Sequence, residues 1–223
     1  DLQNAIREEL LDRGIFRTVS TVLTQVLVDP YDEAFYTPTK VIGRYMSAEE
    51  AAAEKEKGNY CIEVEGKGFR RIVSAPKPVD IIEIDAIRLL VDANQVVIAA
   101  GGGGIPVLLQ GNRLKGASAV IEKDYTAGKL AELIDADMLI ILTNDEKVSI
   151  NLGKENECEL DKVSVAQAKA YMEEGQFGKH AMLPKFEASV SFIEKRQGRA
   201  ALITSFDKLK DAVKGKTGTW ISE

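Results

Sequence analysis

Apolar runs alternate with amphipathic stretches along most of this chain. The runs at residues 18–28, 96–100, 138–143 and 200–204 are continuous and rich in β-branched or aliphatic side chains, which predicts strands buried on both faces. Helical spacing of apolar residues predicts helices at residues 1–14, 80–93, 125–135, 164–174 and 184–195. Shorter strands are expected at residues 107–109, 119–121 and 148–151, with a last edge strand at 217–221. The alternation predicts an α/β fold, a three-layer αβα sandwich with a largely parallel central sheet.

Residues 32–80 interrupt this alternation. They contain a charged helix at residues 48–57 and short strands at 60–64 and 70–73. We therefore expect an inserted lid subdomain at residues 32–80, with residues 1–31 and 81–223 forming the α/β core. A long surface loop is the alternative, although structureless loops of this length are uncommon in compact domains.

Composition narrows the class of protein. The chain has 223 residues, 45% of them hydrophobic, and a net charge of −6, so it carries no electrostatic sign of nucleic-acid binding. No apolar stretch is long enough to cross a membrane, and we expect a cytoplasmic protein. Cys61 and Cys158 lack a CxxC spacing and are expected to be reduced thiols. The single histidine, His180, excludes a His-rich metal site and argues against a Ser-His-Asp mechanism.

Four consecutive glycines, Gly101, Gly102, Gly103 and Gly104, follow the predicted strand at residues 96–100. Bare backbone at the end of a strand can bring N–H groups close to an anion. The run is neither a Walker A loop nor a GxGxxG motif, because no Gly-Lys-Ser/Thr follows and the spacing differs. A flexible turn is the alternative interpretation.

Polar residues follow two other predicted strands, at Thr143-Asn144-Asp145 and at Thr204-Ser205. Ligands of open α/β sheets bind at the carboxyl ends of strands. Lys123-Asp124 stands between a strand and a helix, and Lys185 lies in a first helical turn, where an ammonium is unfavourable without an anion. An ordinary solvated lysine is the alternative in each case. Together these features indicate phosphoryl transfer, which depends on positioning and charge neutralisation more than on a nucleophile.

The sequence resembles the carbamate kinases of the amino acid kinase superfamily. Eight segments carry the resemblance, and they occur in the expected order from one end of the chain to the other. They are residues 22–30, 32–35, 38–43, 74–81, 101–107, 119–124, 130–137 and 182–187.

The resemblance implies interconversion of carbamoyl phosphate and ADP with carbamate and ATP, usually toward ATP. It implies that Lys123 and Lys185 neutralise the phosphoryl group in flight, that Asp124 holds the lysines, and that Lys40 reaches from the lid toward carbamoyl phosphate. The substrate side would be Gly101, Gly102, Gly103, Gly104, Ile105 and Pro106. The nucleotide side would be Thr143, Asn144, Asp145, Val148, Met182 and Pro184. It further implies Mg²⁺ bound with the nucleotide, no dedicated metal ligands, and a homodimer with neither nucleic-acid nor membrane partners.

The chain departs from the family pattern in two places. It begins inside a helix without an initiator Met and lacks the family's two N-terminal glycine loops, so roughly the first 90 residues of the pattern are expected to be missing. Leu152 stands where an aromatic residue is expected beside the nucleotide. Two other functions therefore stay open. One is a superfamily kinase acting on acetylglutamate, glutamate, aspartate or a nucleoside monophosphate, and the other is a non-catalytic module that keeps the fold.

Overall fold

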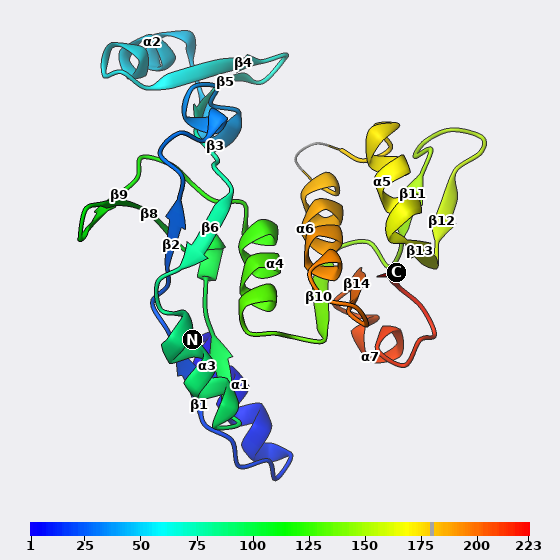
Figure 1. Ribbon diagram of the computed structural model, residues 1–223. Coiled ribbons are helices and arrows are strands. Elements are labelled where there is room, and N and C mark those ends of the chain that lie inside the picture. The colour runs from blue at the N-terminus through cyan, green and yellow to red at the C-terminus, as the bar shows by residue number, and fades with distance from the viewer. Residues whose placement is uncertain (179–180) are drawn as a thin grey trace. The chain divides into compact units, whose positions relative to one another are not determined.

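The computed structural model describes residues 1–178 and 181–223, so His180 lies outside the described residues. The chain divides into two compact units (Figure 1). The first unit comprises residues 1–85 and 90–123, and the second comprises residues 86–89 and 124–223. The α/β class is confirmed, because helices and strands alternate through both units.

The first unit is built on a four-stranded sheet in the order β6-β2-β8-β9. Its central strand, β2 (Gln25–Val28), pairs antiparallel with β6 (Pro78–Ile81) and parallel with β8 (Ile105–Gln110), and β9 (Arg113–Gly116) follows at the edge. A separate parallel pair joins β1 (Val19–Thr21) to β7 (Val96–Ile98). Outside the lid region, the unit's helices are α1 (Leu2–Asp12) and part of α3 (Ile84–Asp92).

The apolar run at residues 18–28 is two strands, not the single strand predicted. The break falls at residues 22–24, where Thr24 makes hydrogen bonds to the residues that flank the glycine run. Its hydroxyl accepts from the Ala100 N–H at 2.8 Å, and its carbonyl accepts from the Ile105 N–H at 2.9 Å. These long-range bonds join the break to the two ends of the glycine run.

The predicted helix at residues 80–93 starts too early in the sequence. Asp80 lies in β6, and α3 begins at Ile84. A turn at residues 82–83 separates the strand from the helix, and there the Ile82 N–H donates to the Gln25 carbonyl while the Glu83 carboxylate accepts from the Gln25 N–H.

The lid region contains an antiparallel sheet in the order β3-β5-β4. The strands β4 (Tyr60–Val64) and β5 (Gly68–Val73) confirm the prediction, and β3 (Lys40–Met46) was not expected. The helix α2 (Ala48–Glu56) begins with a capping box between Ser47 and Glu50. A 3₁₀ turn, η1 (Glu33–Phe35), precedes the sheet. The domain boundaries at residues 31/32 and 80/81 remain predictions.

The second unit has a four-stranded sheet in the order β10-β14-β15-β13. The strands β10 (Met138–Thr143) and β14 (Ala200–Ser205) are parallel, as are β13 (Lys162–Ser164) and β15 (Thr219–Ser222), but β14 and β15 are antiparallel. The last strand is therefore internal, not at the edge. The sheets of both units are mixed, which corrects the largely parallel sheet predicted. The strands β11 (Val148–Ile150) and β12 (Cys158–Leu160) form a separate two-stranded antiparallel sheet.

Besides residues 86–89 of α3, the second unit contains α4 (Lys123–Leu133) from Asp124 onward, α5 (Val165–Glu173), α6 (Leu183–Glu194) and α7 (Leu209–Ala212). Ser164 caps α5, and Pro184 lies in the first turn of α6, as predicted. Phe186 and Ile193 of α6 are fully buried with β14 in the unit's core. No helix among the described residues is long and apolar enough to cross a membrane.

Candidate functional site

The glycine run forms a tight turn, η2 (Gly101–Gly103), whose second half is closely packed. The φ angles are +68° at Gly102, +103° at Gly103 and +83° at Gly104, a region that favours glycine. A Cβ on Gly103 would lie less than 3.0 Å from the carbonyl oxygen of Ile121, and a Cβ on Gly104 would lie equally close to Val26. Glycine is therefore required here both for backbone conformation and for space.

The first half of the run is open. The N–H groups of Gly103 and Gly104 already donate within the turn, to the carbonyls of Ala100 and Gly101 at 2.9 and 3.2 Å. Gly101 and Gly102 are exposed, and among the described residues their N–H groups donate to no protein acceptor. Within the glycine run, Gly101 and Gly102 are therefore the better candidates to bind an anion through their N–H groups, and the anion-binding role of the run stays a prediction.

Replacing Gly103 with alanine should lower the free energy of unfolding by about 1–3 kcal/mol, because alanine is strained at this φ and its Cβ would meet the Ile121 carbonyl. Gly101→Ala is the matched control, since Gly101 has no positive φ and open space around it. Urea unfolding of both variants measures the difference. Equal stability of the two variants would contradict the packing described for Gly103.

Residues 119–122 connect the glycine run to the base of the lid within the first unit. Ser74, which follows β5, forms a parallel bridge with Ala119 and accepts from the Val120 N–H at 3.0 Å. Lys40, the first residue of β3, forms an ion pair with the Glu122 carboxylate. This short segment therefore contacts the glycine run and the lid, and it continues directly into Lys123.

Lys123 and Asp124 begin α4, and Lys185 lies in the first turn of α6. Lys123 is exposed, whereas Asp124 and Lys185 are only 7% and 8% exposed. The Lys185 ammonium lies 3.0 and 3.1 Å from the two carboxylate oxygens of Asp124. Burying either charge alone is costly, and the pairing compensates for it. Lys185 is therefore not an ordinary solvated lysine.

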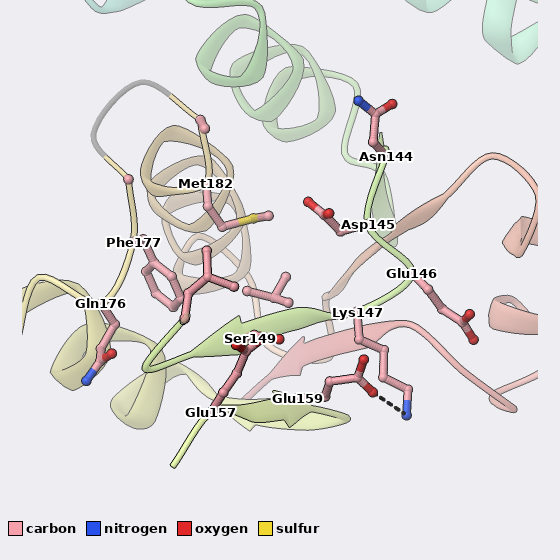
Figure 2. Close-up of a pocket in the computed structure, with 14 residues that line it drawn as sticks. Asn144, Asp145, Glu146, Lys147, Ser149, Glu157, Glu159, Gln176, Phe177 and Met182 are labelled. Atoms are coloured by element: carbon pink, nitrogen blue, oxygen red, sulfur yellow. Dashed lines mark ion pairs between the residues drawn. The ribbon is translucent and has the colours of Figure 1, made fainter. Parts of the chain in front are cut away.

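A pocket of about 550 Å³ lies in the second unit, near the end of β10, the β11–β12 hairpin and the start of α6 (Figure 2). Figure 2 shows the side chains of Asp145 and Met182 pointing toward each other across it. Phe177 lines the pocket and stacks on buried Phe186, with ring centroids 4.0 Å apart. This size and mixture of apolar and polar lining are typical of small-molecule sites.

Charged side chains line the β11 side of the pocket. A hydrogen bond to Asp161, at 2.7 Å, raises the pKa of Lys147. A hydrogen bond from the Thr217 hydroxyl, at 2.6 Å, together with the nearby Lys208, lowers the pKa of Glu146. Both side chains therefore stay charged near neutral pH, and the pocket has a polar rim beside its apolar wall.

The residues predicted to bind the nucleotide fall into two groups, those that line the pocket and those that do not. Asn144, Asp145, Val148 and Met182 line the pocket. Thr143 ends β10 and Pro184 is buried in α6, and neither is among the lining residues. Leu152 also lines the pocket and is 73% exposed.

Of the predicted substrate side, Ile105 and Pro106 begin β8 and pair with Gln25 and Val26 of β2. Sequence reasoning missed Glu122, although it adjoins Lys123. It also missed Gln176 and Phe177, which line the pocket from the segment after α5 and carry no signal in the pattern.

Comparison with known proteins identifies the family. The amino acid kinase family matches residues 34–205. The chain is 56% identical over all 223 residues to the carbamate kinase-like protein YqeA of Escherichia coli, covering 72% of that protein, and 48% identical to the carbamate kinase of Clostridium perfringens, covering 70%. It matches the structure of Giardia lamblia carbamate kinase bound to AMP-PNP with a TM-score of 0.90 and 34% identity, over 99% of this chain and 70% of that one. The chain belongs to the amino acid kinase family and, within it, to the carbamate kinase family.

Proposed function

We propose that the protein transfers a phosphoryl group between carbamoyl phosphate and ADP, forming carbamate and ATP. A terminal oxygen of the ADP β-phosphate attacks the phosphorus, the bond from phosphorus to the carbamoyl oxygen breaks, and carbamate leaves with that electron pair. The observation that carries the proposal is the buried ion pair of Asp124 and Lys185, with Lys123 next to Asp124 in the chain. Carbamoyl phosphate is proposed as the substrate because the chain is similar to carbamate kinases.

In this proposal Lys123 and Lys185 stabilise the negative charge on the transferring group. Such electrostatic stabilisation is worth more where water is excluded, and Lys185 is almost completely buried. Asp124 holds the Lys185 ammonium in place through both carboxylate oxygens. Lys40 contacts the carbamoyl phosphate end after leaving Glu122, and the amides of Gly101 and Gly102 bind oxygens of the same substrate.

The pocket in the second unit takes the nucleoside of ADP or ATP in the same proposal. Phe177 and Met182 offer apolar surface for a base, and Asn144 and Asp145 offer polar groups for orientation. Thr143 and Pro184 act by positioning their neighbours. The described residues contain no cluster of three or more His, Cys, Asp or Glu side chains suited to a metal. In this proposal Mg²⁺ binds together with the nucleotide, whose phosphates would supply oxygen ligands.

ATP formation from carbamoyl phosphate and Mg-ADP tests this function. We expect the protein, expressed with its complete natural reading frame, to form ATP in an assay coupled to hexokinase and glucose-6-phosphate dehydrogenase. Acetylglutamate, glutamate, aspartate and nucleoside monophosphates, each offered with ATP, test the superfamily alternatives. Absence of ATP while carbamoyl phosphate remains intact would contradict the proposal, and phosphorylation of another acceptor would replace it.

A further inference from the structure

The helices α4 and α6 come into close contact at a glycine. A Cβ on Gly128 of α4 would lie 3.1 Å from the carbonyl oxygen of Ala188 and 3.3 Å from its Cβ. Gly128 has no positive φ, so the backbone conformation does not require glycine. Glycine is also less favourable than alanine inside a helix. What Gly128 provides is space between the two helices.

This contact lies one helical turn from the buried ion pair. Gly128 follows Asp124 by four residues and Ala188 follows Lys185 by three, so each contact residue shares a helix face with one member of the pair. A further contact joins the same turns of the two helices, because the Tyr125 hydroxyl donates a hydrogen bond to the Glu187 carboxylate. The separation of α4 and α6 at Gly128 therefore affects the distance between Asp124 and Lys185.

The other ends of the helices are held by a buried arginine. The Arg199 guanidinium donates to the Phe192 carbonyl in α6 at 3.1 Å and to the Ala136 carbonyl, just beyond α4, at 3.1 Å. It also lies 4.5 Å from the centre of the Phe192 ring. Because these ends are fixed, a side chain at residue 128 would separate the helices mainly at the end that carries the ion pair.

We propose that Gly128 is a positioning residue for Lys185. By allowing α4 and α6 to meet, it lets the Asp124 carboxylate hold the Lys185 ammonium in place at 3.0 Å. The inference rests on the proposed function for its consequence in turnover, while its effect on Lys185 can be measured without any activity.

The first test is Gly128→Ala in the complete protein. We expect kcat to fall roughly tenfold, because sub-ångström displacement of a group that stabilises a transition state is costly. The KM for ADP should stay nearly unchanged, because the pocket residues lie outside the contact between Gly128 and Ala188. Gly116→Ala, at an exposed strand position with nothing within 4 Å, is the matched control and should leave kcat unchanged. Adding Ala188→Gly to Gly128→Ala should recover part of the lost kcat.

The second test measures how fast acetic anhydride acetylates Lys185. Peptide mass spectrometry gives this rate, and the rate at the exposed Lys195 in the same protein is the reference. A loosened ion pair should raise the rate at Lys185 several-fold in Gly128→Ala, and the double variant should reverse the rise. If the wild-type protein forms no ATP, the proposed function fails and this labelling alone decides the role of Gly128.

Unchanged labelling of Lys185 in a folded Gly128→Ala protein would overturn the proposal. A fall in kcat with unchanged labelling would also overturn it, since the effect would then act elsewhere. If Gly128→Ala does not fold, Ala188→Ser adds one buried atom on the α6 side of the contact, and the same labelling result is expected.

Discussion

Replacing Lys185 with alanine should lower kcat by at least about 10²-fold, the scale for losing one charge contact to a transition state. The ammonium is buried and held by both carboxylate oxygens of Asp124, so no mobile surface cation can take its position. Steady-state assay of ATP formation at saturating carbamoyl phosphate and ADP measures the change. The KM for ADP should move little, because Lys185 is not among the residues that line the pocket.

Two matched variants make the result specific. Lys195→Ala removes an exposed lysine just after the same helix and should leave kcat unchanged. Lys123→Ala should reduce kcat on the same scale as Lys185→Ala if both lysines stabilise the transferring group. Thermal unfolding separates a catalytic loss from a folding loss, since the Lys185 variant leaves Asp124 buried without its partner. Wild-type kcat in a folded Lys185 variant would remove this lysine from the mechanism.

The strands that form the core were predictable because their side chains are apolar throughout. The prediction at residues 138–143 matches β10, and the one at 200–204 falls short of β14 by one residue. The break in residues 18–28 was not predictable, since β1 and β2 pair with different strands, β7 and β8, which lie far away in sequence. The strand β13 has three residues, and its pairing with β15 is likewise invisible in local pattern.

Residues of the candidate site stand out in the sequence where their chemistry makes them unusual for their local structure. The glycine run and the lysine in a first helical turn stand out because each is locally unfavourable. The pairing of Lys185 with Asp124, 61 residues apart, follows only from the fold or from the resemblance. Gly128 carries no signal at all, because a single glycine inside an amphipathic helix is unremarkable until the facing helix is known.

Removing Asp124 should be the most destabilising change at the site. Asp124→Ala leaves the Lys185 ammonium buried without a counter-charge, and we expect the free energy of unfolding to fall by about 3–5 kcal/mol. Asp137→Ala is the matched control: Asp137 pairs with Arg196 at the surface, where an ion pair contributes no more than about 1 kcal/mol. Urea unfolding, followed by circular dichroism, gives both values.

A double variant then separates stability from function. Asp124→Leu combined with Lys185→Met replaces the buried pair with apolar side chains of similar size, and such replacements are often neutral or stabilising. We expect the double variant to recover most of the stability lost in Asp124→Ala and to form no measurable ATP. Recovered stability without ATP formation would mean that the fold does not need the ion pair. The pair would then serve to position the Lys185 ammonium for catalysis. An active double variant would contradict the role proposed for both residues, and a double variant as unstable as Asp124→Ala would show that the pair supports the fold itself.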